Sequence, residues 1–397
     1  MTAAPFRIAV PDVEIDALRA AIARTRWPDQ IDGAGWDYGT ERGYLQELLA
    51  YWADGFDWRA QEARLNATRQ IRAALDAEAF PAFPAFGVHC AHQRGVGPDP
   101  LPLVLTHGWP STHFEYQQVI GPLSDPGAHG GDPADAFHVV VPSLPGYGFS
   151  DIPSARGMTP RVVAALWVAL MRDLGYDRFA AAGCDWGAYV TALLGLDHPD
   201  ALVGIHMGML NFRAAGERTP TAEDREYAAA AGDWRRTEIG YSMIQGTKPQ
   251  SLAYGLTDSP AGLAAWIVEK WRRWSDCGGD VESLFTRDDL LTTIAIYWFT
   301  GTINSANRLY YESRTTPIRL AEGQRIDPPA GFLLERRIDG PNPNIGPPPR
   351  SRADAVYDVH RWTVADRGAH FPALENPDLY VAELRAFFRP LRGRREI

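Results

Sequence analysis

The chain has 397 residues, of which 45% are hydrophobic and 22% charged, and its formal net charge is −10. This composition is typical of a globular protein, and the negative charge argues against nucleic acid or an anionic membrane as a partner. Three cysteines are too few for a disulfide framework or a zinc site, the longest apolar runs are shorter than a membrane span, and no signal peptide is recognisable. We therefore expect a cytoplasmic protein without a membrane anchor.

Residues 1–95 form the first predicted segment, an N-terminal helical extension. Apolar residues recur at helical spacing in DVEIDALRAAIARTRW, and Pro28 ends that helix. The stretch GTERGYLQELLAYWADGFDW predicts a second amphipathic helix, rich in Trp and Tyr. Two prolines in FPAFPAFGVHC then interrupt regular structure ahead of a short strand. The aromatic residues serve either a core or a helical arm packed on the next domain.

Residues 96–212 show alternating strands and helices. The apolar run LPLVLT is typical of a buried parallel strand, and FHVVVP and FAAAG repeat the pattern. Between them, Thr159 and Pro160 predict the N-cap and first position of an amphipathic helix. Strands that alternate with helices indicate βαβ units and a mostly parallel sheet flanked by helices.

The alternation stops at about residue 213 and resumes after residue 320. Residues 213–320 are predicted to be a helical cap, or lid, inserted into the α/β core. Residues 321–397 then complete the core with PPAGFLLE, YDVHRWTVAD and a last helix in NPDLYVAELRAFFRPL. The fold class is therefore α/β, with one interrupted core.

A sharp turn is predicted at AAGCDWGAY, where Gly183 and Gly187 flank Asp185 symmetrically. In a strand–turn–helix elbow the central side chain projects at the top of the sheet, and the small neighbours permit the turn. The central residue here is Asp185, so Cys184, one position away, is interpreted as inert filler. The alternative for Asp185 is a helix N-cap, a common use of aspartate before a helix.

Two further stretches favour the reactive role. HGWP, residues 107–110, follows an early strand, where α/β-hydrolases place a loop whose N–H group completes an oxyanion hole. His370 in DRGAHF follows the last predicted strand, which gives the nucleophile-first, histidine-last order of that fold. We therefore predict Asp185 as the nucleophile and His370 as the base.

A carboxylate nucleophile suits displacement at a saturated carbon, because it is already ionised and leaves an alkyl ester on the enzyme. Water must then attack the carbonyl carbon of that ester. His370 would activate the water, and the N–H groups of Trp109 and Trp186 would form the oxyanion hole. The substrates of such a site are epoxides or alkyl halides.

The chain resembles the epoxide hydrolases of the α/β-hydrolase superfamily, in particular the microsomal type with a helical N-terminal extension. The resemblance covers nearly the whole chain. Within the family, the chain looks like a soluble bacterial relative. The motifs that carry it are RTRWPD, HGWPST, PSLPGYGFS, GCDWGA, IQGTKPQSLAYGLTDSPAGLAAWIVEKW, YWFTGTINSANRLYYES and RGAHFPALENPDL.

The resemblance implies two cap tyrosines that hydrogen-bond the epoxide oxygen and protonate the leaving alkoxide. Tyr241, before SMIQGTKP, and Tyr310, within RLYYE, hold the matching places. Tyr311 is adjacent to Tyr310, and a slip of one residue would exchange the two, so both stay open for the second donor.

The acid that orients the histidine departs from the family pattern. Relatives carry Glu or Asp shortly after the strand that PPAGFLLERRIDG matches, but a gapless match puts Ile338 there. Asp339 is the favoured acid, and Glu335 and Asp354 are the alternatives. Without such an acid the first step could proceed, but hydrolysis of the ester would slow.

The predicted function is that of an epoxide hydrolase that gives a vicinal diol and uses no cofactor and no metal. The aromatic cap favours a bulky apolar or aromatic epoxide, in detoxification or natural-product tailoring. The alternatives are a haloalkane- or haloacid-type dehalogenase, against which the paired tyrosines argue, and a catalytically silent ligand-binding α/β-hydrolase. A homodimer is neither indicated nor excluded by the sequence.

Overall fold

The computed structural model describes residues 3–75, 82–83, 85–215, 219–338 and 344–393. Within these residues a nine-stranded sheet runs in the order β1-β2-β3-β5-β4-β6-β7-β8-β9. The strands are β1 (Ala4–Phe6), β2 (Gln70–Leu75), β3 (Phe86–Gln93), β4 (Leu101–Thr106), β5 (Phe137–Pro142), β6 (Phe179–Gly183), β7 (Leu202–Met207), β8 (Ile326–Leu334) and β9 (Tyr357–Val364).

The sheet is mixed and mostly parallel, as predicted. The strands from β4 and β5 through β9 pair in parallel, whereas β1, β2, β3 and β5 pair antiparallel. At the centre, Val104 of β4 aligns with Val140 of β5 on one side and Ala181 of β6 on the other. The two N-terminal strands β1 and β2 were not predicted, because β1 has three residues and β2 is buried without a clean alternation.

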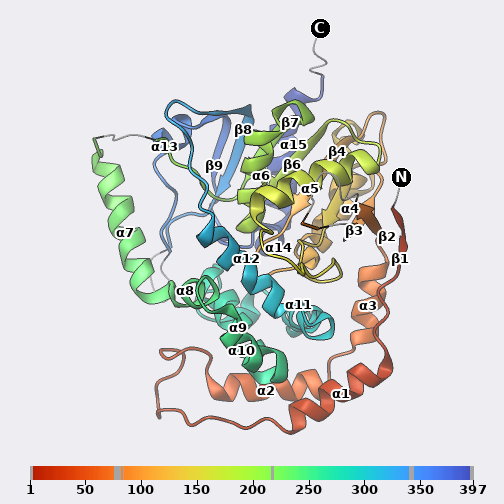
Figure 1. Ribbon diagram of the computed structural model, residues 1–397, viewed down its shortest axis with the longest axis vertical. Coiled ribbons are helices and arrows are strands. Elements are labelled where there is room, and N and C mark those ends of the chain that lie inside the picture. The colour runs from red at the N-terminus through yellow and green to blue at the C-terminus, as the bar shows by residue number, and fades with distance from the viewer. Residues whose placement is uncertain (1–2, 76–81, 84, 216–218, 339–343, 394–397) are drawn as a thin grey trace.

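Helices cover both faces of the sheet (Figure 1). α5 and α6 pack on each other and α6 lies on the central strands, whereas α4 and α15 pack together on the opposite face. No helix of the described residues is long and apolar enough to cross a lipid bilayer. The helices of the core are α4 (Gln117–Ser124), α5 (Pro160–Asp173), α6 (Trp186–Asp197), α13 (Arg350–Asp354), α14 (Pro372–Glu375) and α15 (Pro377–Phe388).

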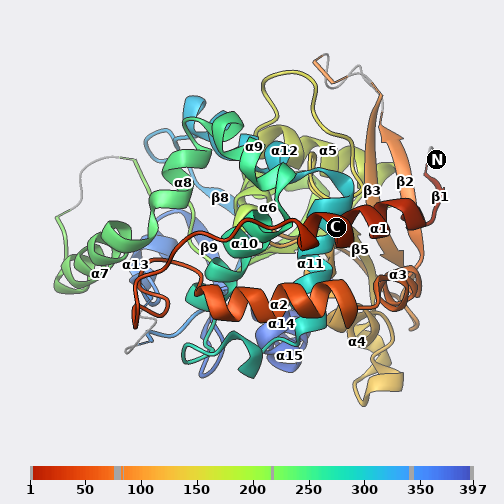
Figure 2. The same ribbon diagram turned by 90° about the horizontal axis from the view of Figure 1, so that it is seen from below.

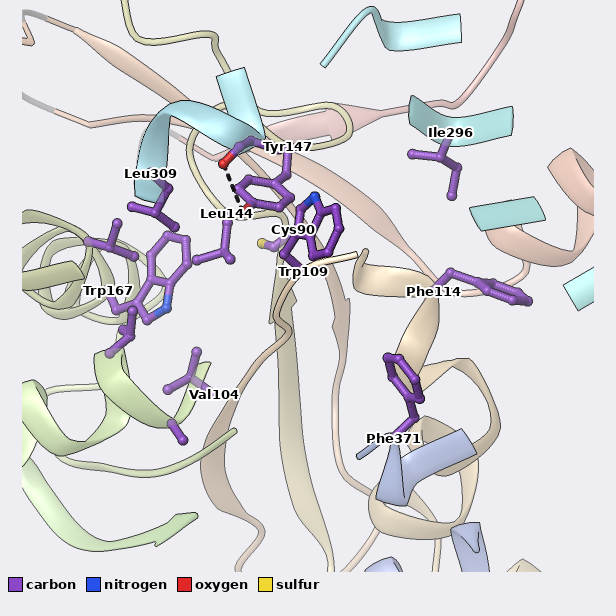
Figure 3. Close-up of a cluster of buried hydrophobic side chains, with 14 of the residues drawn as sticks. Cys90, Val104, Trp109, Phe114, Leu144, Tyr147, Trp167, Ile296, Leu309 and Phe371 are labelled. Atoms are coloured by element: carbon purple, nitrogen blue, oxygen red, sulfur yellow. Dashed lines mark hydrogen bonds between the residues drawn. The ribbon is translucent and has the colours of Figure 1, made fainter. Parts of the chain in front are cut away.

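The central strands and the α5–α6 layer share one apolar core. Thr159 accepts a hydrogen bond from the N–H of Val162 and so caps α5, as predicted. Val104, Leu144 and Trp167 are fully buried between these elements, and Figure 3 shows them with their neighbours. The alanine-rich β6 leaves room for α6 to approach the sheet closely, which matters for the turn between them.

The helices of the predicted cap gather at one end of the sheet, with α7 projecting to the side (Figure 1). Several of them are almost wholly buried where they meet, and Ile294, Ile296 and Tyr297 of α11 are inaccessible to solvent. The cap helices are α7 (Ala222–Glu238), α8 (Gly240–Gln245), α9 (Pro249–Asp258), α10 (Pro260–Trp274), α11 (Arg287–Thr300) and α12 (Ile303–Thr315).

Between β1 and β2 the N-terminal segment runs across the cap helices (Figure 2). Its helices are α1 (Asp12–Ala23), α2 (Arg42–Asp54) and α3 (Trp58–Asn66). The Tyr51 hydroxyl donates to Asp288 at 2.8 Å and Arg64 pairs with Asp289 at 2.9 Å, both at the start of α11. The segment therefore ties the cap to the core from outside.

Candidate active site

Asp185 lies at the turn between β6 and α6, with φ 52° and ψ −125°, a conformation that side chains rarely adopt. A Cβ at Gly187 would overlap the carbonyl oxygen of Thr106, and one at Gly183 would come within 2.6 Å of the Gly187 main chain. Both neighbours must therefore be glycine, which is the reason for the motif. Asp185 does stand at the N-cap position of α6, but its side chain makes no capping hydrogen bond there.

The Asp185 carboxylate is held by the loop that follows β4. The N–H of Trp109 donates to Asp185 Oδ1 at 2.9 Å, and the Trp109–Pro110 peptide bond is cis. Burial raises the pKa of Asp185, whereas His370 and the N–H groups of Trp109 and Trp186 oppose that rise. Two N–H groups thus act on the carboxylate from the two positions predicted for the oxyanion hole.

His370 lies in the loop between β9 and α14, with Nε2 at 3.6 Å from Asp185 Oδ2. Burial lowers the pKa of His370, and the charge of Asp185 opposes that change. A neutral imidazole is the form that can accept a proton from water. The two predicted residues are therefore brought together although 184 other residues separate them in the sequence.

Cys184 is not poised to react. Burial raises the pKa of its thiol well above the ordinary value. The Sγ donates a hydrogen bond to the carbonyl oxygen of His370 at 3.3 Å. The thiol contributes to the contact between the turn and the histidine loop, not to chemistry.

The cap brings two phenols over this pair. Tyr241 of α8 stacks on Trp109 at 5.1 Å between ring centroids, and Tyr310 of α12 packs edge-on against Trp186 at 4.7 Å. The two phenol rings are 5.8 Å apart. Burial raises the pKa of both hydroxyls, so both are protonated at neutral pH. Tyr311 makes no ring contact with any of these residues in the described part of the chain, so Tyr310 is the member of the pair that faces the site.

The Tyr310 hydroxyl is buried and lacks a hydrogen-bond partner of ordinary geometry among the described residues. A buried donor without an acceptor costs free energy unless a ligand supplies one. The Tyr241 phenol lies beside it, and each phenol perturbs the pKa of the other. A donor in this state is available for an acceptor atom that enters from the cavity.

Three residues were predicted as candidates for the acid that orients His370. The favoured residue, Asp339, lies outside the described residues. Glu335 follows β8 directly, burial raises its pKa to about 7, and a hydrogen bond with Asn344 opposes the rise. Its charge acts on the thiol of Cys184, although no hydrogen bond joins it to His370 in the described part of the chain. Asp354 pairs with Arg350 at 3.5 Å with its side chain 50% exposed, so it belongs to the surface.

A cavity of about 350 Å³ adjoins the two aromatic residues Trp186 and Tyr310. Both polar atoms of the Asn211 side chain are buried at its wall without a hydrogen-bond partner among the described residues. The residues that line the cavity are Pro160, Trp186, Tyr189, Asn211, Phe212, Ser242, Gly246, Tyr310, Ser313, Arg314, Thr316, Pro317 and Ile318. The wall is therefore largely apolar, with a few polar groups.

Sequence reasoning missed Trp274, the last residue of α10. Its ring lies 5.0 Å from that of Tyr241 and 4.9 Å from that of His370. It thus links the cap tyrosine with the predicted base. A tryptophan at the end of an amphipathic helix carries no sequence signal for such a place, because the same pattern serves a core.

The comparisons with known proteins show the family of this chain. A family model described as epoxide hydrolase N terminus matches residues 3–116, and one described as alpha/beta hydrolase fold matches residues 102–268. A protein of Stigmatella aurantiaca (strain DW4/3-1) with a provisional epoxide-hydrolase name is 39% identical, over 98% of this chain and 86% of its own length. Epoxide hydrolase 1 of Oryctolagus cuniculus is 31% identical, over 96% and 88%. The chain belongs to the microsomal-type epoxide hydrolases.

Solved structures give the same answer for the fold of this epoxide hydrolase. The epoxide hydrolase of Aspergillus niger matches with a TM-score of 0.83 at 27% identity, over 98% of this chain and 97% of that chain. The juvenile hormone epoxide hydrolase of Bombyx mori matches with a TM-score of 0.82 at 26% identity, over 99% and 95%. The predictions of the family, of an ether-bond hydrolase and of the α/β-hydrolase fold are confirmed.

Proposed function

We propose that this epoxide hydrolase opens its substrate by attack of Asp185 on a ring carbon. In the first step Asp185 Oδ2 bonds to the carbon while the carbon–oxygen bond of the epoxide breaks. Tyr241 and Tyr310 hydrogen-bond the epoxide oxygen, and one phenol transfers its proton to the oxygen that leaves. The product of this step is a hydroxyalkyl ester of Asp185.

In the second step His370 takes a proton from water, and the resulting hydroxide attacks Cγ of the ester. The N–H groups of Trp109 and Trp186 stabilise the oxyanion that forms at Oδ1. The bond between Cγ and Oδ2 then breaks, His370 returns the proton to the leaving oxygen, and the diol departs. The Asp185 carboxyl, which now carries one oxygen from solvent, gives its remaining proton to the tyrosinate left by the first step, so the carboxylate and the phenol are both restored.

One observation carries the proposal: the two oxygens of Asp185 face different partners. Oδ1 accepts the N–H of Trp109 at 2.9 Å, while Oδ2 faces His370 Nε2 at 3.6 Å. One oxygen is therefore held as the future carbonyl oxygen, and the other is left to attack on the side of the base. A catalytically silent binding protein needs no such division.

We infer that residues 213–320 act as the cap and that the substrate is a bulky apolar or aromatic epoxide. The aromatic and aliphatic wall of the 350 Å³ cavity supports this class, since an apolar body gains free energy by leaving water. The comparison that tests it is kcat/KM for styrene oxide against 1,2-epoxypropane. Turnover confined to the small aliphatic epoxide would overturn the substrate class.

The ester mechanism is tested by mass spectrometry of a His370→Gln variant mixed with styrene oxide. A mass gain of one substrate, mapped to Asp185, is expected, because the first step does not need the base. The wild type after one turnover in water enriched in ¹⁸O should carry the label in the Asp185 carboxyl.

The control is the variant Asp185→Ala, which should form no adduct. An adduct at Cys184, or diol formation by Asp185→Ala at the wild-type rate, would contradict the mechanism. A haloalkane that alkylates Asp185 when epoxides do not would instead indicate a dehalogenase.

A further inference from the structure

The loop that carries His370 has no regular structure, yet its main chain is held at every residue around the histidine. Four consecutive N–H groups, from Gly368 to Phe371, each donate a hydrogen bond. The N–H of Gly368 donates to Asp276 Oδ2 at 3.2 Å, and that of His370 donates to the carbonyl oxygen of Trp274 at 3.2 Å. Both acceptors belong to the end of α10 and the residues just after it, which are part of the cap.

The other two N–H groups share one carboxylate. Ala369 N donates to Glu375 Oε2 at 3.0 Å, and Phe371 N donates to Glu375 Oε1 at 2.8 Å. The N–H of Asp276 donates to the same Oε2 at 2.9 Å. Glu375, at the end of α14, thus binds the residues on either side of His370 and a cap residue at the same time.

The main-chain N–H groups are the hydrogen-bond partners of the Glu375 carboxyl among the described residues. The side chain is partly exposed, yet its burial in the loop raises its pKa to about 7, and the three N–H donors oppose that rise. Burying a carboxyl group costs free energy, and the main-chain donors offset part of that cost. A neutral side chain of the same size would fill the space at lower cost, so the value of the carboxylate lies in its two acceptor oxygens.

A third segment joins at Asp276. Arg336 Nη2 lies 3.2 Å and 3.1 Å from the two carboxylate oxygens of Asp276. Arg336 follows β8, in the stretch that carries the candidate acids Glu335 and Asp339. The histidine loop, the stretch after β8 and the end of α10 are therefore connected through Glu375 and Asp276.

We infer that Glu375 is a positioning residue that sets the path of the His370 loop and connects it to the cap through Asp276. Glu375 acts through His370 and does not touch the substrate. The inference rests on the proposed function, in which His370 is the base of the second step. It follows that loss of the carboxylate should slow hydrolysis of the ester and spare the alkylation of Asp185.

The variant Glu375→Gln tests this in the full-length enzyme. Glutamine keeps the size but turns one acceptor oxygen into an NH₂ group, which cannot accept from an N–H. In single-turnover experiments with styrene oxide we expect hydrolysis of the ester to slow by about 10- to 100-fold, the cost of a slightly misplaced base. Alkylation should stay within about threefold of the wild type. The ester should then accumulate during turnover and be visible by mass spectrometry at Asp185.

The matched control is Glu383→Gln in α15. Glu383 is buried, at 2% exposure, and its carboxylate accepts from Arg361 at 2.6 Å and from Thr363 at 2.7 Å. Those partners lie in β9, away from the histidine loop. Glu383→Gln should lower the melting temperature without any change in the ratio of alkylation to hydrolysis, so a merely structural role is distinguished from a positioning role.

Several outcomes would overturn the inference. In Glu375→Gln, either a hydrolysis rate equal to that of the wild type or a parallel fall of both steps would do so. If Glu375→Gln does not fold, Asp276→Ala supplies the test, because it removes the acceptor for Gly368 and should slow hydrolysis selectively. Failure of the proposed function would look different: His370→Gln would then form no adduct at Asp185.

Discussion

The turn that carries Asp185 and the loop that carries His370 meet at 3.6 Å, but different parts of the chain hold them. The turn is held by its own main chain, because Gly183 and Gly187 let β6, α6 and the end of β4 come into contact. The histidine loop is held by acceptors from elsewhere, namely Glu375 Oε1 and Oε2, Asp276 Oδ2 and the Trp274 carbonyl oxygen.

This difference separates the two steps of the reaction. In the proposed mechanism the first step needs the Asp185 turn and the phenols, whereas the second needs the histidine loop as well. Since that loop is hydrogen-bonded to residues at the end of α10, we expect the position of His370 to depend on the position of the cap relative to the core. Substitutions that distort the Asp185 turn should therefore abolish both steps, whereas substitutions that displace the His370 loop should slow only hydrolysis of the ester.

The largest effect is expected for Gly187→Ala. The added Cβ would overlap the Thr106 carbonyl oxygen, which is main chain and has no free direction in which to move. We expect loss of all activity and at least about 4 kcal/mol of the free energy of unfolding. Thermal unfolding and the single-turnover assay provide the measurements.

The control for this substitution is Gly255→Ala in α9, where the new Cβ would meet nothing within 4 Å. Removal of a helical glycine should raise the free energy of unfolding by about 0.5–1 kcal/mol. If Gly187→Ala behaved like Gly255→Ala, the turn would not depend on its main-chain contacts, and the contrast between the two loops would be lost.

Tyr310→Phe should slow the first step and spare the second, which is the reverse of the effect expected for Glu375→Gln. The phenol is carried by the cap, yet its proton is needed in the first step. We expect alkylation to slow by about 100-fold, with hydrolysis of the ester within about threefold of the wild type. Stability should stay the same or rise, since the buried hydroxyl lacks a partner among the described residues. Tyr311→Phe is the control, and equal effects of the two substitutions would contradict the assignment.

The same contrast explains what the sequence could predict. The Asp185 turn follows from steric rules that are local: a strand, a Gly-x-Asp-x-Gly motif and a helix suffice. The order of strands and helices also defined the fold, and the histidine followed from its place after the last strand.

The support of the histidine loop could not be predicted in this way. Glu375 lies within the quoted motif RGAHFPALENPDL, but a glutamate five residues after a histidine has no local signature. Its proposed role involves the N–H group of Asp276, 99 positions earlier in the chain. The acid stayed open for a related reason, since the stretch after β8 has no regular pattern against which to align Asp339 or Glu335.

The pH dependence should also distinguish alkylation from hydrolysis, with a smaller effect than the substitutions above. Burial holds the pKa of His370 below its ordinary value of 6.5, and only the neutral form accepts a proton from water. Esterification removes the Asp185 charge that opposes this lowering. The imidazole by itself should therefore leave hydrolysis constant above pH 6.5 and cause a fall of about tenfold per pH unit below its lowered pKa. Protonation of Glu375, whose pKa is raised to about 7, should add a separate decrease near pH 7 that is absent in Glu375→Gln.

In a rapid-quench series from pH 8 to pH 4.5, the fraction of enzyme present as ester should rise on the acid side. A constant ester fraction while turnover falls would mean that the first step fails together with the second. His370 would then not be the group that limits hydrolysis in acid.

The smallest effect on activity is expected at Glu115, a buried carboxyl that interacts with both loops through the charges of Asp185 and Glu375. Burial raises its pKa from 4.5 to about 8. A carboxyl with a raised pKa contributes stability that is complete below the unfolded pKa and is lost as the pH rises through the folded one. The protein should therefore lose stability between about pH 4.5 and pH 8.

Glu115→Gln should reduce this loss by about 1–3 kcal/mol, as measured by urea unfolding at pH 5 and pH 9. Some pH dependence of the same sign should remain, because Glu335 and Glu375 also have pKa values raised to about 7. Both reaction steps should stay within about threefold of the wild type at pH 7, since a carboxyl with a pKa near 8 is mostly protonated there and resembles the amide. A selective loss of hydrolysis in Glu115→Gln would show that the segment after β4 also positions the histidine loop, which would then not depend on Glu375 and the cap alone.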